Sequence, residues 1–343
     1  MTGTPNTMNT NPPCYERICV VGAGAIGGWL AAALSRAGRR VSLLARGQTL
    51  TALQSRGLQL QTGPADAPQM HGFDVKASAD AASLGVQDLV IVAVKAPALK
   101  AVAQQIGPLI GPQTVVLTAM NGVPWWFLHG FGGALQDQAL ETVDPGGTIA
   151  MAIGAGQVIG GVVHASCSVA APGVIRHGFG NKIIVGEPSG ERSERVLALA
   201  ALLQAGGLEA PVSEQIQRDI WFKLWGNMTM NPVSAFTGAL SSDIMDDELV
   251  LAFCSRAMRE ARAIGIGFGV AIDQEPADRH AVTRKLGAFK TSMLQDVEAG
   301  KAVELDALVA SVRELGQLTG VPTPEIDTLL GLARLHARMH GLY

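Results

Sequence analysis

Apolar residues recur along the chain in two patterns, and the change from one to the other divides the sequence. Up to about residue 212, short runs of β-branched and other apolar residues alternate with helix-like segments. Such runs are typical of strands buried on both faces of a parallel sheet. From about Glu214 onward the apolar residues follow helical spacing. We therefore predict an α/β domain over residues 16–212 and an all-α domain over residues 213–343.

The first predicted strand, residues 18–21, leads directly into a glycine-rich turn. The turn has the pattern G-x-G-x-x-G and consists of Gly22, Ala23, Gly24, Ala25, Ile26 and Gly27. In dinucleotide-binding folds these glycines allow the tight turn, the approach of backbone to a pyrophosphate, and close packing of helix on strand. A helix and a second strand, residues 41–44, follow at the right distance. This context predicts a doubly wound Rossmann-type sheet with a dinucleotide at the helix N-terminus.

The residue that follows the second strand distinguishes between the two nicotinamide dinucleotides. An acidic residue there binds the ribose 2′-hydroxyl of NAD, whereas an arginine accommodates the 2′-phosphate of NADP. This chain has Arg46 at that place, and its next acidic residue is Asp66. We predict NADPH/NADP+ as the cofactor; the alternative is that Arg46 is an ordinary surface residue.

Two further buried runs, residues 88–94 and 114–119, predict neighbouring strands of the same sheet. Lys95 follows the first run, and Asn121 follows the second. Open α/β sheets bind their ligands at the carboxyl ends of parallel strands. We therefore expect both side chains at the ligand-binding edge.

Two other stretches of the first domain are also expected to be β structure. Residues 57–61 alternate between apolar and polar, as an edge strand does. Residues 148–187 are rich in glycine and β-forming segments, with no long helix between them. We predict that they extend the sheet with antiparallel strands.

One face of a predicted helix in the second domain carries polar groups among apolar neighbours. Lys223, Asn227 and Asn231 stand four residues apart and therefore share a face. Pro232 disfavours helical geometry at Asn231, so we expect a kink or the end of the helix there. Asparagines can orient a ligand oxygen without holding the lysine in a permanent ion pair. The face is either a lysine-containing site or an ordinary solvated surface.

A second polar stretch follows further along the helical half. It contains Ser292, Glu304 and Asp306. Their spacing alone favours exposed polar positions on ordinary helices.

Composition excludes some classes of function. The net charge of −3 and the pI of about 6.2 give no general reason to expect nucleic acid or an anionic membrane as a partner. The four cysteines form no metal-ligand pattern, so we predict reduced thiols, a cytoplasmic location and no metal. Residues 1–15 lack the features of a signal peptide and are predicted to be a disordered leader. An apolar helical domain is compatible with a homodimer, although no heptad pattern requires one.

Taken in order, these motifs resemble the ketopantoate reductases (2-dehydropantoate 2-reductases). The resemblance covers residues 17 to about 330. It rests on G-A-G-A-I-G, Arg46, V-K-A, N-G-V, K-L-x-x-N-x-x-x-N-P, S-M-L-Q-D and E-L-D. It implies that NADPH reduces the 2-oxo group of ketopantoate to give (R)-pantoate for pantothenate and coenzyme A biosynthesis.

The resemblance also implies a role for individual residues. In the first domain it implies that the glycine turn holds the pyrophosphate, that Arg46 holds the 2′-phosphate, and that Lys95 and Asn121 line the path to the nicotinamide. In the second domain it implies that Lys223 is the general acid and that Asn227 and Asn231 are amides that orient the substrate. It also implies that Ser292 binds a substrate carboxylate or hydroxyl, and that Glu304 positions Lys223 or the substrate. Hydride delivery builds negative charge on the carbonyl oxygen, which a nearby lysine can stabilise and protonate.

Two departures from the family pattern bear on the substrate. Where the family commonly has an asparagine, ten residues after Asn231, this chain has Ser241, which has a shorter reach. Trp125 and Trp126 make the loop after Asn121 bulkier than is usual, and they either belong to the core or narrow the mouth of the cleft. In the second case the substrate would be another 2-oxo acid or ketone. A further hypothesis, a non-catalytic NADP(H)-binding module, leaves Lys223 without a role as proton donor.

Overall fold

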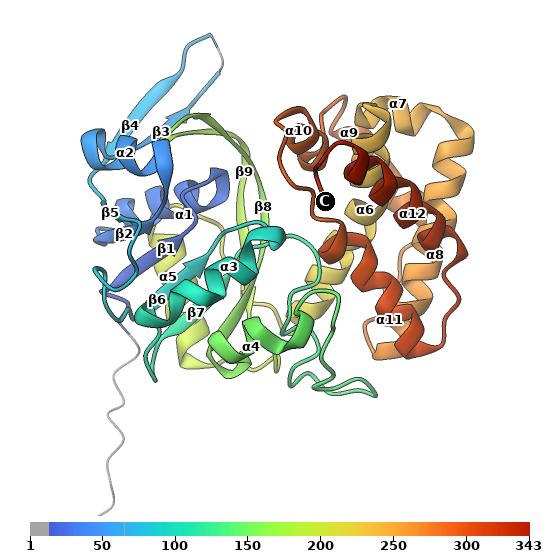
Figure 1. The fold of residues 1–343 in the computed structure, drawn as a ribbon, viewed down its shortest axis with the longest axis horizontal. Helices are drawn as coiled ribbons and strands as arrows, with labels where there is room; N and C mark the ends of the chain where they lie inside the picture. The colour runs from blue at the N-terminus through green and yellow to red at the C-terminus, as the bar shows by residue number, and fades with distance from the viewer. Residues whose placement is uncertain (1–13, 65) are drawn as a thin grey trace, which may run out of the picture.

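The computed structural model describes residues 14–64 and 66–343, with a sheet-containing half beside a helical half (Figure 1). One nine-stranded sheet has the order β4-β3-β9-β8-β7-β6-β1-β2-β5. Its strands are β1 (Ile18–Val21), β2 (Val41–Leu44), β3 (Leu58–Thr62), β4 (Gln69–Phe73), β5 (Lys76–Ser78), β6 (Leu89–Val92), β7 (Val115–Thr118), β8 (Val158–Ala171) and β9 (Val174–Gly186).

The helices divide between the two halves in chain order. Those associated with the sheet are α1 (Ala25–Arg36), α2 (Gly47–Arg56), α3 (Ala96–Ile106), α4 (Thr148–Ala152) and α5 (Glu194–Ala205). Those of the helical half are α6 (Ile216–Thr237), α7 (Ser241–Asp246), α8 (Glu248–Phe268), α9 (Pro276–Lys285), α10 (Ser292–Glu298), α11 (Ser311–Thr319) and α12 (Pro324–Met339). A π-helical turn, η4 (Asp306–Ala310), precedes α11.

The continuous apolar runs form the parallel centre of the sheet. β1 pairs in parallel with β2 on one side and with β6 on the other. Alternate side chains of β1 enter two different cores: Cys19 and Val21 pack with α3 and the helical half, whereas Ile18 and Val20 pack with α1 and α5. Burial on both faces explains why these strands show no polar alternation. Helices therefore cover both faces, and the predicted doubly wound sheet is confirmed.

The ligand-binding edge lies where the strand order reverses. β2 follows β1 on one side and β6 lies on the other, so β1 and β6 flank the topological switch point. The turn after β1 packs against the loop after β6, since a Cβ at Gly22 would lie 2.7 Å from Val94 Cγ1. Lys95 and Asn121 follow β6 and β7 at the same edge. The polar residues predicted for this edge thus share it with the glycine turn.

The antiparallel extension is present but shorter than predicted. β8 runs parallel to β7 and then pairs with β9 in antiparallel fashion. Residues 148–152, which we expected to be β structure, form α4 instead. Asp144 explains this difference, because its carboxylate accepts hydrogen bonds from Ile149 N at 2.8 Å and Ala150 N at 2.9 Å, which begins a helical turn.

The prediction of an edge strand at residues 57–61 was wrong. β3 lies between β4 and β9 and pairs with both, and β4 is the strand at the edge. Gln59 and Gln61 are partly exposed although their strand is internal. Alternation of apolar and polar residues therefore indicates that one face of the strand is solvated. It does not distinguish an internal strand from an edge strand.

The helix that carries the polar face does not end at Asn231. α6 continues through Pro232 to Thr237 and ends at Gly238, which has a φ of 77°. A proline inside a helix costs about 3 kcal/mol. Packing on all sides offsets this cost, because α6 contacts α8, α10, α12 and β8 and most of its residues are buried.

The structure bears on two further predictions, the disordered leader at residues 1–15 and the domain boundary between residues 212 and 213. Residues 1–13 lie outside the described residues, but Tyr15 is buried and its hydroxyl donates to Arg195 O at 2.8 Å. Tyr15 therefore belongs to the fold, because its ring enters the core beside α5. The boundary between residues 212 and 213 stays a proposal, which is supported by a last β-bridge at Val212 and by the start of α6 at Ile216. Within the described part of the chain, no helix has both the length and the apolar character that crossing a membrane requires.

Candidate active site

Lys223 reaches from α6 to the sheet-containing half. Its Nζ donates to Asn121 Oδ1 at 2.8 Å and to Val163 O at 2.7 Å. A lysine ammonium has three N–H donors, so one remains for a ligand. Burial lowers the pKa of Lys223 from 10.5 to about 8; the charge of Glu304 opposes this effect and that of Arg279 adds to it. The ammonium is therefore held between α6 and the sheet-containing half, and it gives up its proton more readily than an exposed lysine.

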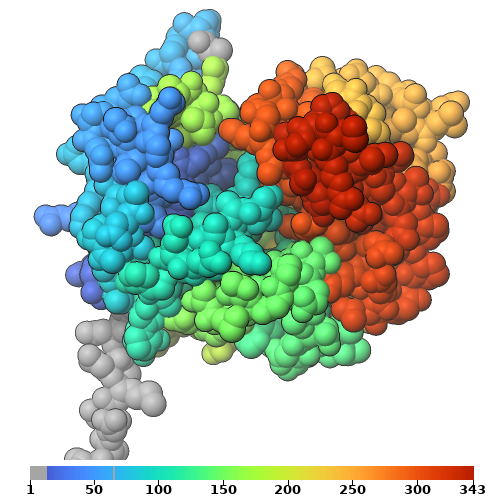
Figure 2. Space-filling model, in the orientation of Figure 1, coloured from blue at the N-terminus to red at the C-terminus, as the bar shows by residue number. Residues whose placement is uncertain are grey.

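The loop that carries Asn121 is fixed to the helical half. Gly122 has a φ of 81°, and a Cβ there would lie 2.4 Å from Ala307 O. Val123 N donates to the same carbonyl at 2.8 Å. Ala307 belongs to η4, and π-helical turns are frequent at functional sites. In Figure 2 the green segment of the chain, which includes this loop, lies directly against the orange and red helices.

Two buried carboxylates of the helical half bind the loop that follows β6. Glu304 is only 6% exposed, and its Oε1 accepts from Ala96 N at 3.0 Å. Burial raises the pKa of Glu304, although the hydrogen bond from Ala96 and the charges of Lys95 and Lys223 oppose that rise. Asp296, on α10, forms an ion pair with Lys95. The predicted residues Lys95 and Glu304 thus lie together, and both halves of the molecule contribute to the cluster.

The two asparagines occupy the next turns of α6 after Lys223. Asn231 is 6% exposed and Asn227 is partly buried. Among residues 14–64 and 66–343, no side-chain hydrogen bond is formed by either amide, and Asn227 keeps some exposure to solvent. An amide that is sheltered but unpaired can donate to or accept from a ligand oxygen. Both therefore remain candidates for substrate binding.

Ser292 is exposed at the first position of α10. The helix is capped by the preceding residue, Thr291, whose Oγ1 accepts from Leu294 N at 3.2 Å. The Ser292 hydroxyl is therefore not needed for capping. Since α10 packs on α6, Ser292 lies on a neighbour of the helix that carries Lys223.

Ser241 is in a different situation from the other predicted ligands. It is 1% exposed, its hydroxyl donates to Gly287 O at 2.9 Å, and it accepts from Phe289 N at 2.9 Å. The structure thus uses this hydroxyl to hold the loop before α10. It does not present Ser241 as an available ligand beside the asparagines.

Both tryptophans belong to the core. Trp126 is 2% exposed, its Nε1 donates to Thr118 Oγ1 at 3.2 Å, and its ring fills the space above Gly160. Trp125 Nε1 donates to Ile153 O at 3.3 Å. Trp125 also lines a cavity of about 160 Å³ between α3 and the segment 142–149. This cavity is not lined by Lys223 or by the asparagines.

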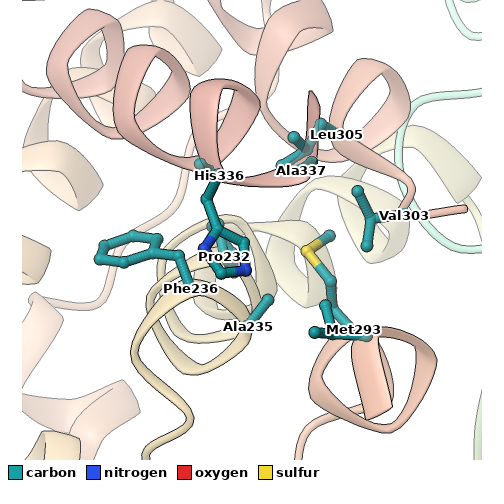
Figure 3. A pocket seen from close by; sticks show the side chains of 10 residues that line it. Pro232, Ala235, Phe236, Met293, Val303, Leu305, His336 and Ala337 are labelled. Atoms are coloured by element: carbon teal, nitrogen blue, oxygen red, sulfur yellow. The ribbon is translucent and has the colours of Figure 1, made fainter. Parts of the chain in front are cut away.

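A second cavity lies beside Pro232, between α6, α10 and α12 (Figure 3). Most of its lining is apolar, from residues such as Met293 and Val303. Its volume of about 10 Å³ holds one water molecule at most. It is therefore too small to bind a substrate.

The glycine turn has the geometry that a dinucleotide requires. A Cβ at Gly27 would lie 1.9 Å from Gly22 O, so helix and strand are as close as the motif predicts. Gly24 is exposed, and nothing lies within 4 Å of the place where its Cβ would be. The N-terminus of α1 has neither a side-chain cap nor an acidic residue in its first turn. These features fit a pyrophosphate, which the helix dipole and the free N–H groups would bind.

Arg46 lies close to this turn. Gly22 N donates to Leu44 O at 3.2 Å, which ties the turn to the end of β2, and Arg46 follows two residues later. Arg46 is exposed and has no acidic partner in the described part of the chain. Its guanidinium is therefore available for a phosphate.

Two charged residues of this region are not among those predicted from the sequence. Asp296 belongs to the S-M-L-Q-D motif, so a search of each motif for acidic partners of Lys95 could have identified it. Arg279, on α9, lowers the pKa of Lys223 and that of His164 by its charge. It lies outside the seven motifs, and we find no signal in the sequence that points to it.

Reduction of a carbonyl by a nicotinamide needs a dinucleotide site and a proton donor. The first half of this chain carries the glycine turn, and the second carries the buried Lys223, which is a candidate for the donor. The protein is therefore an oxidoreductase of the dinucleotide-dependent class. Residues 18–190 match the family model of Ketopantoate reductase PanE/ApbA, and residues 215–337 match that of the Ketopantoate reductase PanE/ApbA C terminal. The chain belongs to the ketopantoate reductase family.

Individual relatives cover almost the whole chain. The 2-dehydropantoate 2-reductase of Mesorhizobium japonicum is 47% identical over 328 residues, which are 95% of this chain and 99% of the relative. The crystal structure of a candidate ketopantoate reductase from Ralstonia solanacearum is 58% identical, has a TM-score of 0.91, and covers 96% of this chain and 100% of its own. The structure of 2-dehydropantoate 2-reductase from Geobacter metallireducens is 26% identical, with a TM-score of 0.80 and coverage of 93% and 99%.

Proposed function

We propose that this protein catalyses the NADPH-dependent reduction of 2-dehydropantoate (ketopantoate) to (R)-pantoate, a step in pantothenate and coenzyme A biosynthesis. The relative with 47% identity carries this activity in its name, and it matches 95% of the chain. The observation that carries the proposal is the position of Lys223, whose Nζ is held by Asn121 and Val163 with one donor to spare. A binding module without catalysis would not need such a group.

Bound NADPH would supply the hydride, and residues of the chain would stabilise and protonate the oxygen that becomes negative. As the carbonyl carbon accepts hydride, negative charge develops on its oxygen. The third N–H of Lys223 stabilises this oxygen and then transfers its proton to it. Asn121 Oδ1 and Val163 O fix the direction of the other two N–H bonds, so the donor is oriented before the substrate binds.

Three uncharged side chains would hold the substrate around this donor. Asn227 and Asn231 extend along α6 from Lys223, and their amides have no partner in the described residues. Ser292 adds an exposed hydroxyl on α10. Glu304 raises the pKa of Lys223 by its charge, and it therefore helps to keep the acid protonated.

The cofactor contacts follow from the first domain. The N–H groups at the start of α1 would bind the pyrophosphate beside Gly24, where the space is open. Arg46 would bind the 2′-phosphate and so favour NADPH over NADH. Lys95 and Asn121 stand at the carboxyl ends of β6 and β7, at the edge where the nicotinamide would lie.

The place and the assembly of the enzyme remain predictions. The four cysteines are free, which supports a cytoplasmic location, where thiols stay reduced. Apolar side chains of α12 are exposed, with Leu332 at 53%, Leu335 at 60% and Met339 at 75%. They offer one surface on which a homodimer could form.

The alternative substrates lose their main support. Another 2-oxo acid or ketone was predicted for the case in which Trp125 and Trp126 narrow the substrate site. Both rings are buried, and the cavity that Trp125 lines is not lined by Lys223. The position of Lys223 disfavours the non-catalytic module, because a binding module needs no oriented proton donor.

Identification of the product tests this proposal. The purified protein is incubated with NADPH and ketopantoate, and the product is separated on a chiral column. We expect (R)-pantoate in an amount equal to the NADPH consumed. The (S)-isomer, or no pantoate at all, would overturn the proposal.

A further inference from the structure

Arg279 carries a charge that no group in the described part of the chain neutralises. Its Nε is buried without a hydrogen-bond partner, and burial lowers its pKa with no carboxylate to oppose the effect. The other arginine of α9 behaves differently, since Arg284 pairs with Asp246 at 2.9 Å. An unpaired, sheltered guanidinium is costly to maintain, so its retention calls for an explanation.

The guanidinium lies against α6, on the flank next to the proposed acid. A Cβ at Gly226 would be 2.9 Å from Arg279 Nε and 3.1 Å from its Nη2. The guanidinium also stacks over the ring of Phe222, with 5.8 Å between Cζ and the ring centroid. Gly226 follows Lys223 by three residues and is therefore its neighbour on the helix surface. The charge of Arg279 also acts on Lys223, so the guanidinium lies near the proposed acid.

The glycine itself supports this placement. Gly226 is buried inside a 22-residue helix, where a glycine costs about 1 kcal/mol relative to alanine. It makes no turn, and the groups that a side chain there would meet first are the guanidinium atoms of Arg279. The missing side chain of Gly226 therefore makes room for the arginine.

Several positive charges lie close together around Lys223 and His164. Lys223, Arg279 and Lys182 all act on His164, whose pKa burial and these cations lower to about 4. Positive charge is therefore concentrated around Lys223 and His164, and in the described residues only Glu304 opposes it at Lys223. An anionic substrate would relieve this repulsion, whereas a neutral ketone would leave it in place.

We propose that Arg279 binds the carboxylate of the 2-oxo acid substrate and thereby selects 2-oxo acids over neutral ketones. This inference rests on the proposed function. In a 2-oxo acid the carboxylate is bonded directly to the carbonyl carbon, so a second cation beside Lys223 is placed to bind it. A guanidinium matches a carboxylate through two parallel N–H donors, which a lysine cannot provide.

The test compares two arginines of the same helix by a binding measurement that needs no turnover. Binding of oxamate, an unreactive analogue of a 2-oxo acid, is measured by calorimetry on the NADP+ complex of wild type, Arg279→Met and Arg284→Met. We expect Arg279→Met to weaken oxamate binding about 100-fold, or about 2.8 kcal/mol at 1.4 kcal/mol per tenfold. Arg284→Met should change it less than about twofold, because its ion pair is exposed. NADPH affinity should stay the same in both variants.

Two kinetic readouts separate carboxylate binding from a structural role. Arg279→Met should raise KM for the 2-oxo acid far more than it lowers kcat, and Arg279→Lys should restore part of the loss. The pKa of Lys223 should rise in Arg279→Met, because one cation is removed while Glu304 remains, so the alkaline limb of the pH profile should move above about 8. A variant that is merely less well folded would not show this shift.

The outcomes distinguish this inference from the proposed function. Wild type that binds oxamate through Arg279 but does not reduce ketopantoate would leave the inference standing and overturn the function. An Arg279→Met variant that reduces ketopantoate with an unchanged KM would overturn the inference and leave the proposed function standing. Failure of wild type to bind oxamate, or a loss of NADPH affinity instead of oxamate affinity, would overturn the assignment of Arg279.

Discussion

Replacing Lys223 with alanine removes the proposed proton donor and little else. The side chain contacts Asn121 and Val163 and is not part of the glycine turn, so NADPH affinity should remain nearly intact. A positioned general acid contributes about 10²- to 10⁴-fold to the rate. At 1.36 kcal/mol per tenfold, kcat should fall by the equivalent of about 3 to 5 kcal/mol.

The pH dependence of the wild type should identify the same group. Lys223 must be protonated to act as an acid, so kcat/KM should fall as pH rises through its pKa of about 8. Glu304 raises that pKa, and Glu304→Gln should therefore move the fall in activity to a lower pH. The residual activity of Lys223→Ala should lack this transition.

The assay measures steady-state NADPH oxidation with ketopantoate between pH 6 and 10, together with the Kd for NADPH from fluorescence. Lys285→Ala is the matched control, because Lys285 is an exposed lysine at the end of α9. It should behave as wild type. If Lys223→Ala keeps kcat within a few-fold of wild type, or loses NADPH binding in parallel with turnover, the acid role is refuted.

Other substitutions test other parts of the site. Gly27→Ala should destabilise the protein by about 3 kcal/mol in urea unfolding, because its Cβ would meet Gly22 O at 1.9 Å. Gly24→Ala, whose Cβ meets nothing within 4 Å, should leave stability unchanged and weaken NADPH binding; equal stability of the two variants would contradict this account of the turn. Arg46→Ala should raise KM for NADPH about tenfold or more and leave KM for NADH unchanged, and a loss shared by both cofactors would exclude the 2′-phosphate contact. Ser241→Ala should cost about 1 to 3 kcal/mol of stability and leave KM for ketopantoate unchanged, because Gly287 O and Phe289 N lose their partner; a raised KM at full stability would return Ser241 to the substrate site.

Local patterns predicted the parallel centre of the sheet because its strands and turn are specified by neighbouring residues. The run Ile18–Val21 is buried on both faces, and Gly22 and Gly27 meet within a few residues of each other. The place of β3 in the sheet depends instead on β9, which lies more than a hundred residues away. Likewise, the start of α4 depends on the side chain of Asp144, and packing carries α6 past Pro232.

The candidate site was predictable to the extent that it lies in sequence motifs. Lys223 and Asn121 both belong to motifs of the resemblance, and the structure brings them into contact although 102 positions separate them. Asn227 was placed by helical spacing alone. Arg279 could not be predicted, because its importance comes from the absence of a partner and from the space above Gly226. Those are properties of the folded molecule.

The most direct test of the central claim is a comparison of kcat/KM for ketopantoate with NADPH, for a panel of other 2-oxo acids with NADPH, and for ketopantoate with NADH. The account predicts the highest value for ketopantoate with NADPH, and a clear loss when NADH replaces it. A higher value for another oxo acid, or equal values for the two cofactors, would contradict it.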